Sequence, residues 1–345
     1  MEAATHPLTL DDARALRAAG DWRALADRGA ATPPEVLAAE PEVAYAYAAA
    51  CRHLGDARRA VQVAELARDE ARRHGNRLLS AEAVNLIGNA CFEQGRLEDA
   101  ERSFAELLQG AADWGDEEFT ARASNNLGVI SNVRGRRDLA LASYQRALAA
   151  YHRLGNVLGL AQTHHNLGIS YRDLGFDADA DAHFRRAMEM VDAARAAGVA
   201  RAETDLESLV GIAETERALL RARAGDGALA EALARRALQR FRDLGEPWGQ
   251  ADALRVLAAA ARAAGRDSDA RALLDQSLEI AREHNYLLPL AEVQRDRGLL
   301  LRDAGDTAGA VEALTASAAH FRTLGAAAEA EAVAAIARAV GPHPA

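Results

Sequence analysis

Amide and guanidinium side chains recur at intervals of about 40 residues, and their chemistry suits the binding of another molecule. An Asn side chain both donates and accepts hydrogen bonds, so it can pair with the N–H and C=O groups of an extended peptide. An Arg side chain can bind a carboxylate through two parallel hydrogen bonds. The candidate binding residues are Asn85, Asn89, Asn125, Asn132, His165, Arg172, Arg255, Arg262, Arg295 and Arg302.

These side chains lie on one stripe of successive predicted helices, where the spacings +4 and +3 return to the same face. In most repeats an apolar residue separates two polar ones, as Val129 separates Asn125 from Asn132. The stripe suits a peptide, either an acidic one or one with a free C-terminal carboxylate. The alternative is an ordinary solvated face, because carboxylates flank the stripe and could pair with the Arg side chains. The flanking carboxylates are Glu82, Asp173, Asp252, Glu292 and Asp303.

The chain lacks the motifs that would indicate catalysis. It contains no Lys, so no phosphate-binding G-x-x-x-x-G-K-[ST] loop can form, and it has no G-x-S-x-G, C-x-x-C or H-E-x-x-H segment. His164 and His165 are adjacent, and adjacent helical residues point about 100° apart, so they do not both face one metal ion. Cys51 and Cys91 are interpreted as small core residues. We therefore expect no enzyme activity, no metal and no cofactor.

Charge and hydropathy exclude two further classes of partner. The net charge is −10, and no run of basic residues is present, which is unfavourable for contacts with nucleic-acid phosphates. No apolar run approaches the roughly 20 residues that span a bilayer, and the first 20 residues lack the apolar region of a signal peptide. We expect a cytoplasmic protein that binds neither nucleic acid nor membrane.

Paired amphipathic helices must position the stripe. Ser124, Leu127, Gly128 and Ser131 share one face of a first helix, and a second helix with Tyr144 follows the break at Gly135. Glycines recur at the same interval along the chain. They are expected at helix ends, because a helix commonly ends at a residue in the left-handed conformation. The turn glycines are Gly55, Gly95, Gly135, Gly175, Gly225, Gly265 and Gly305. A second series closes each hairpin, and in it Asn285 replaces Gly, the substitution that this conformation tolerates best.

The spacing of these glycines predicts that the chain has three parts. Residues 1–40 form a degenerate hairpin or cap, residues 41–325 form seven hairpins, and residues 326–345 form a capping helix and tail. The interval from Gly175 to Gly225 is ten residues longer than the others, which predicts either two longer helices or a bend near 198–200. The last helix is Ala-rich, and its apolar residues suit either a cap on the array or the face of a homodimer.

The repeated string resembles the tetratricopeptide repeat, whose pattern joins x2-L-G-x2-Y to A-x3-F. In this chain, one match to the pattern consists of Leu167, Gly168, Tyr171, Ala180 and Phe184. This resemblance implies an all-α fold, a right-handed superhelical solenoid of antiparallel helix hairpins.

The Asn-Leu-Gly strings at 126–128 and 166–168 and the 40-residue period look like the long-helix versions of this repeat. Those versions occur in kinesin light chain, in Leu-Gly-Asn repeat proteins and in bacterial peptide-sensing regulators. The resemblance implies that the polar stripe lines a concave groove that holds a peptide or helical segment of a partner protein. The expected function is a protein–protein interaction scaffold, and the alternative is a bacterial sensor of a signalling peptide.

Overall fold

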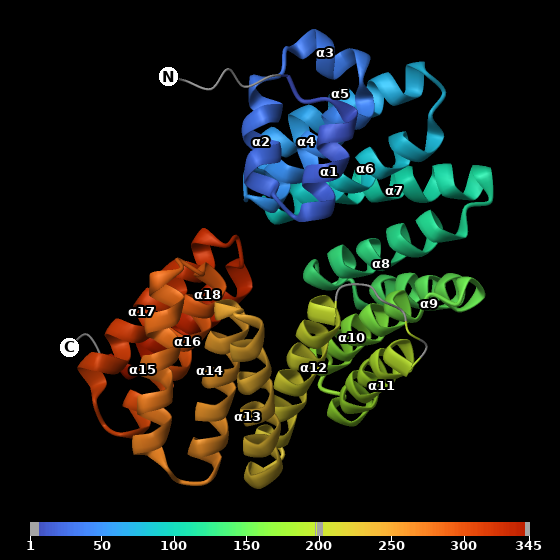
Figure 1. Cartoon of the computed structure of the whole chain (residues 1–345). Helices are drawn as coiled ribbons and strands as arrows, with labels where there is room; N and C mark the ends of the chain where they lie inside the picture. The colour runs from blue at the N-terminus through green and yellow to red at the C-terminus, as the bar shows by residue number, and fades with distance from the viewer. Residues whose placement is uncertain (1–6, 197, 199–202, 342–345) are drawn as a thin grey trace. The chain divides into compact units, whose positions relative to one another are not determined.

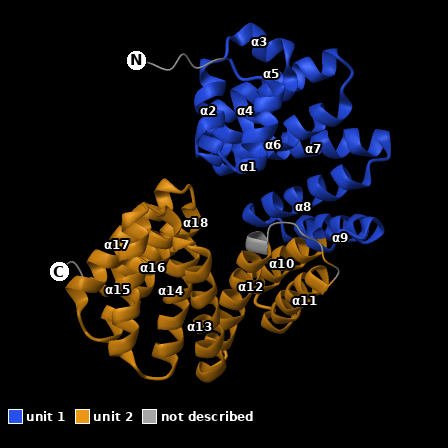
Figure 2. Cartoon of the chain, viewed as in Figure 1, with its two compact units in different colours: residues 1–159 blue, residues 160–345 orange. Residues whose placement is uncertain are grey.

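The computed structural model describes residues 7–196, 198 and 203–341, and all regular structure in these ranges is α-helical (Figure 1). The chain divides into two compact units, residues 1–159 and 160–345 (Figure 2). Unit 1 holds α1 (Leu10–Ala19), α2 (Trp22–Ala31), α3 (Pro34–Ala39), α4 (Pro41–His53), α5 (Ala57–Arg73), α6 (Arg77–Glu93), α7 (Leu97–Trp114), α8 (Glu117–Val133) and α9 (Arg137–Leu154). The border between the units falls within α10 (Val157–Asp173).

Unit 2 continues with helices of the same kind. They are α11 (Asp177–Ala196), α12 (Glu203–Arg223), α13 (Gly227–Leu244), α14 (Pro247–Ala263), α15 (Asp267–Glu283), α16 (Leu287–Asp303), α17 (Thr307–Thr323) and α18 (Ala327–Val340). Consecutive helices pack in pairs, such as α14 with α15 and α16 with α17. The predicted fold class, an all-α array of helix hairpins, is confirmed.

The even-numbered helices also contact one another within each unit. In unit 1, α4 contacts α6 and α6 contacts α8; in unit 2, α12 contacts α14 and α14 contacts α16. Each even-numbered helix therefore belongs to a layer as well as to a hairpin. Side chains at the same repeat position on successive even-numbered helices lie near one another in this layer.

Residues in the left-handed backbone conformation connect the helices, as the spacing of the glycines predicts. Gly135 has φ +70° and Gly265 has φ +71°. Asn285 has φ +52° and is the only non-glycine residue with positive φ among the described residues. The next helix often begins with a side-chain cap: the Asp116 carboxylate accepts a hydrogen bond from the Phe119 N–H at 3.0 Å. In the same way, the Asn76 and Asn156 side chains accept hydrogen bonds from the N–H groups of Leu79 and Gly159.

A close approach between paired helices explains the glycine in the Leu-Gly string. A Cβ atom on Gly128 of α8 would lie 2.5 Å from the ring of Tyr144 on α9. Gly88 meets Phe104 and Gly168 meets Phe184 in the same way. Tyr144, Phe104 and Phe184 are buried, so each aromatic ring fills the space that the missing side chain leaves.

The long interval corresponds to two long helices, α11 with 20 residues and α12 with 21. Most helices from α5 to α17 have 17 or 18 residues, so the prediction of longer helices is confirmed. The predicted bend concerns residues 198–200, of which 199 and 200 lie outside the described residues. The bend stays a prediction.

The apolar side of α18 faces its own unit. Val333 is buried in a cluster with Leu314 and Phe321 of α17, and Ile336 and Val340 pack against the same cluster. This arrangement is the one expected of a cap at the end of the array. The homodimer stays a prediction.

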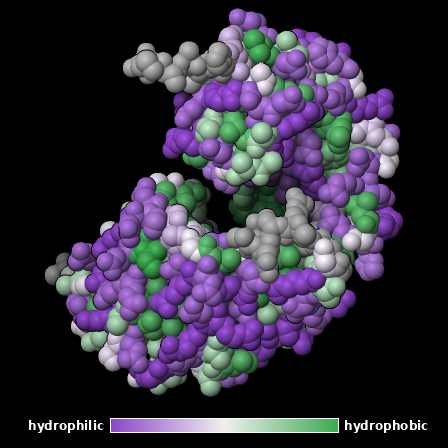
Figure 3. All heavy atoms as spheres, viewed as in Figure 1, coloured by the Kyte–Doolittle hydropathy of each residue, from purple (hydrophilic) through white to green (hydrophobic). Residues whose placement is uncertain are grey.

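The outer surface is mainly polar. Hydrophilic residues cover most of the face shown in Figure 3, and hydrophobic residues form small separate patches on it. Within the described part of the chain, no helix combines the length and the apolar composition needed to cross a membrane.

Candidate functional site

A cleft of about 820 Å³ lies in unit 2 and is lined mainly by α12, α14 and α16, with the end of α10. Its charged lining is balanced, with five guanidinium groups and five carboxylates: Arg172, Arg223, Arg255, Arg262, Arg295, Asp173, Glu216, Asp252, Glu292 and Asp296. Leu219, Trp248, Leu288 and Leu299 supply apolar walls. A volume of this size is typical of sites that enclose part of a ligand.

The repeat explains why these side chains meet. Arg255 and Arg295 are 40 residues apart, as are Asp252 and Glu292, and Trp248 and Leu288. Each pair occupies the same position on α14 and α16, which contact each other in the layer of even-numbered helices. One position in the repeat therefore contributes two neighbouring side chains to the cleft.

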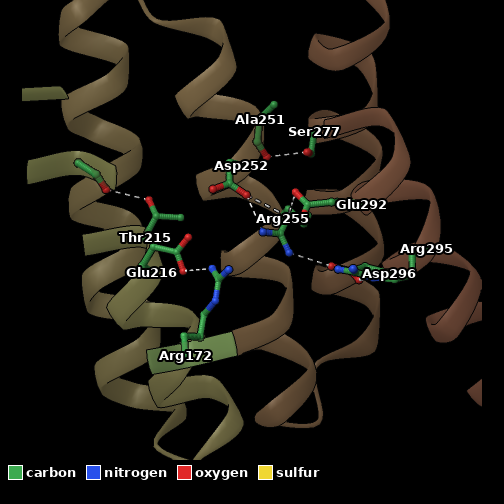
Figure 4. A network of polar contacts seen from close by, with 11 residues as sticks. Arg172, Thr215, Glu216, Ala251, Asp252, Arg255, Ser277, Glu292, Arg295 and Asp296 are labelled. Atoms are coloured by element: carbon green, nitrogen blue, oxygen red, sulfur yellow. Dashed lines mark hydrogen bonds and ion pairs between the residues drawn. The ribbon is translucent and has the colours of Figure 1, made fainter. Parts of the chain in front are cut away.

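Arg255 is the centre of an ion-pair network (Figure 4). Its Nε and Nη2 atoms donate to Asp252 Oδ1 at 3.0 and 2.6 Å, and its Nη1 atom donates to Asp296 Oδ2 at 3.2 Å. The Glu292 carboxylate lies 3.7 Å from Arg255 Nε. Arg295 donates to the other oxygen of Asp296 at 2.9 Å, so Asp296 joins the two Arg side chains. The network ties α14 to α16.

The remaining predicted Arg side chains also have carboxylate partners. Arg172 of α10 binds Glu216 of α12 at 2.5 Å and its neighbour Asp173 at 2.8 Å (Figure 4). Asp303 accepts from both Arg262 and Arg302. These pairs correspond to the alternative interpretation of the sequence, in which the flanking carboxylates neutralise the Arg stripe. Arg223 differs, since it is exposed and forms no ion pair with any described residue.

Burial and charge act in opposite directions on the ionisable groups of the network. Burial lowers the pKa of the Arg255 guanidinium, but Asp252, Glu292 and Asp296 outweigh this effect and raise it well above its ordinary value. Burial raises the pKa of the Glu292 carboxyl, and the opposing attraction of Arg255 does not cancel the rise. Arg255 therefore stays charged, and at Glu292 the effect of burial outweighs the attraction of Arg255.

Four predicted site residues are more buried than side chains that line an open groove would be. Asn85, Asn125, His165 and Arg255 are between 5% and 8% exposed. They occupy the same repeat position on even-numbered helices. In unit 1 the Asn126 amide donates to Asn85 Oδ1 at 3.4 Å and to Asn89 Oδ1 at 3.5 Å, across the α6–α8 contact.

The more accessible predicted residues can reach a ligand. Asn89, Asn132, Arg172, Arg262 and Arg295 are half-buried, and Arg302 is exposed. Of the predicted residues, the cleft brings together Arg172, Arg255, Arg262 and Arg295. Their role in binding stays a prediction.

The histidines of α10 have separate environments, as their adjacent positions predict. His164 Nδ1 lies 3.0 Å from His183 Nδ1 on α11, whereas the ring of His165 packs 5.6 Å from that of Phe184. Burial lowers the pKa of both His164 and His165 to about 4. No group of three or more His, Cys, Asp or Glu side chains with the placement of a metal site occurs among the described residues. Cys51 and Cys91 are buried free thiols.

Sequence reasoning missed several members of the cleft, namely Glu216, Trp248, Leu288 and Asp296. Two signals could have found some of them. Trp248 and Leu288 are large apolar residues at one repeat position, and Asp296 follows Arg255 by 41 residues, which is the offset between facing positions on successive even-numbered helices.

The sequence matches the tetratricopeptide repeat family over residues 119–193 and 209–283. No curated protein sequence matches it.

Among solved structures, the chain is similar to a Rap protein in complex with Competence and Sporulation Factor, with 15% identity, a TM-score of 0.61 and coverage of 96% of each chain. It is similar to the Rap conjugation gene regulator of plasmid pLS20 in complex with the Phr* peptide, with 16% identity, a TM-score of 0.54 and coverage of 78% of this chain and 76% of that one. It also resembles a signal transduction ATPase with a tetratricopeptide repeat sensor from Pyrococcus horikoshii, with 16% identity and a TM-score of 0.59 over 86% of this chain. The chain spans only 44% of that ATPase.

Proposed function

Because the chain is built from tetratricopeptide repeats, we propose that it is a protein–protein interaction scaffold that holds a peptide or helical segment of a partner against its even-numbered helices. The proposed role is non-enzymatic and cytoplasmic. The observation that supports it most is the cleft of unit 2, where α12, α14 and α16 present charged and apolar side chains to one space.

The composition of the cleft suits a polypeptide. Leu219, Leu288 and Leu299 offer contacts to aliphatic side chains, and the charged groups offer hydrogen bonds that fix the orientation of the ligand. A binding surface with a few apolar anchors and a polar surround is typical of protein interfaces. The acidic ligand that the sequence suggests would need guanidinium groups without carboxylate partners. Of the five Arg side chains that line the cleft, four are paired with carboxylates, and only Arg223 forms no ion pair with a described residue.

Affinity capture tests the proposal. The immobilised chain is exposed to a lysate of its source, and captured proteins are compared between the wild type and a Trp248→Ala/Leu288→Ala variant. Both side chains line the cleft and are 39% and 42% exposed, so the variant should keep its melting temperature. Loss of about 1–3 kcal/mol of binding would weaken the affinity for a true partner about five- to 150-fold.

The control is Arg235→Ala, which removes an exposed Arg from α13 that pairs with Glu231 on the same helix. The control should capture the partner as the wild type does. Equal capture by the cleft variant and the wild type would contradict the assignment of the cleft.

The second candidate function is a sensor of a signalling peptide. It is favoured by the similarity to the pLS20 Rap regulator, which was solved with the Phr* peptide. A sensor binds a short free peptide, whereas a scaffold binds a segment within a whole protein. Calorimetry with synthetic peptides that cover the captured partner separates the two, since only a scaffold should bind the intact partner as tightly as its best peptide.

A further inference from the structure

We propose that the cleft of unit 2 selects a cationic group of the bound segment, an Arg or Lys side chain or a free N-terminal amine, and places it against the Glu292 carboxylate. This inference rests on the proposed function and names the chemistry of the partner. It reverses the sign of the charge that the sequence alone suggests for the ligand.

The first observation is that Glu292 lacks a hydrogen-bond donor. The three nitrogen atoms of Arg255 donate to Asp252 or Asp296, and the nearest of them is 3.7 Å from Glu292. Glu292 accepts no hydrogen bond from any described residue. Its side chain is 27% exposed and lines the cleft, so a ligand can reach it. A carboxylate in such a place gains most from a charged donor.

The second observation comes from the same repeat position in unit 1. Glu82 of α6 occupies the position of Glu292, and Arg122 of α8 binds both of its oxygens at 2.8 and 3.0 Å. Arg122 follows Glu82 by 40 residues. The residue that follows Glu292 by 40 is Ala332 of α18, whose side chain is uncharged. The repeat thus supplies a hydrogen-bonded cation for Glu82, whereas Glu292 has only the 3.7 Å contact with Arg255.

The third observation is the local balance of charge. Three carboxylates, Asp252, Glu292 and Asp296, share two guanidinium groups, Arg255 and Arg295. One added cation would neutralise this group, whereas an added anion would raise the excess to two negative charges. Burial raises the pKa of the Glu292 carboxyl, and a bound cation would favour its ionised form.

The walls of the cleft suit the rest of a basic side chain. Trp248 and Leu288 are 39% and 42% exposed although they are large and apolar, and both line the cleft. The methylene stems of Arg and Lys pack on apolar surfaces while the charged end reaches a polar partner. An indole face also attracts a guanidinium or ammonium group. The expected ligand therefore has a basic residue next to aliphatic ones.

A positional-scanning library of hexapeptides provides the test. One position at a time is fixed, the other positions are mixtures, and free and acetylated N-termini are compared. Binding is followed by the fluorescence of Trp248 in the full chain, with Trp22 and Trp114 replaced by Phe. We expect Arg or Lys at one position, or the free amine, to bind at least tenfold more tightly than norleucine there, and Glu to bind more weakly than norleucine.

Two variants and a control assign the preference to Glu292. Glu292→Gln keeps the shape of the side chain and should abolish the preference for a cation. Ala332→Arg places at the equivalent position the guanidinium that Arg122 supplies in unit 1, and it should block the basic ligand while the fold is kept. Glu312→Gln removes an exposed carboxylate of α17 and should leave the preference unchanged.

The outcomes separate this inference from the proposed function. If library peptides bind and Glu is preferred, or if Glu292→Gln retains the preference for a cation, the inference is wrong and the scaffold function stands. If no library peptide binds and capture also yields no partner that depends on the cleft, both are wrong.

Discussion

His165 shows how one buried side chain can make the stability of this chain depend on pH. The residue is almost fully enclosed on α10, and its Nδ1 atom has no hydrogen-bond partner among the described residues. Burial lowers its pKa from 6.5 to about 4, so folding favours the neutral ring. Its contribution to stability is therefore complete above pH 6.5 and is lost as the pH falls through 4. The shift corresponds to roughly 3 kcal/mol.

We expect the free energy of unfolding, measured in urea at several pH values, to fall between pH 6.5 and 4. A His165→Leu variant should lose roughly 3 kcal/mol less over this range than the wild type. His152→Leu replaces an exposed histidine of α9 and should follow the wild type. If the His165 variant has the pH profile of the wild type, the buried neutral ring is not the cause.

Residues whose conformation depends on near neighbours were predictable, and residues that depend on other repeats were less so. The left-handed Asn285 follows from its place in the glycine series, because only the local backbone decides that conformation. The burial of Arg255 cannot be predicted from the sequence of its own helix. Asp296 lies 41 residues away, and only the packing of α14 on α16 shows that the two meet.

At the scale of the helix pair, the contact of α8 with α9 depends on the absence of a side chain at Gly128. A Cβ atom there would lie 2.5 Å from the buried Tyr144 ring, so Gly128→Ala forces the two helices or the ring to move. Overpacking of this kind costs about 1–3 kcal/mol. We expect a matching fall in the urea midpoint of unit 1.

Gly227→Ala is the matched control, because the nearest atom to its added Cβ, the carbonyl oxygen of Ala260 on α14, is 3.7 Å away. It should keep or slightly raise the stability, since Ala is the better helix former. Equal effects of the two substitutions would mean that helix propensity, and not the Tyr144 contact, decides the outcome.

Helix pairs were predictable because each follows from an apolar stripe and a glycine within some 40 residues. The layer of even-numbered helices was harder to predict, because the sequence of one helix does not show which neighbouring helix covers its second stripe. Asn85 and Asn125 lie on the stripe that the resemblance assigns to an open groove, yet adjacent helices enclose them. The solvent exposure of a stripe is a property of three helices and not of one.

At the scale of the whole chain, the division into two compact units predicts that damage to one unit stays in it. Arg255→Met would leave Asp252, Glu292 and Asp296 short of a cation in unit 2, and breaking a buried pair in this way costs about 3–5 kcal/mol. In repeat proteins stability is close to a sum of terms from each repeat and its neighbours. We therefore expect native-state hydrogen exchange to accelerate in α14, α15 and α16, while α4 to α8 keep the rates of the wild type. Arg302→Met removes an exposed side chain whose one ion-pair partner among the described residues is Asp303, and it should leave both units unchanged. A uniform acceleration over all measured helices in the Arg255 variant would mean that the two units unfold as one.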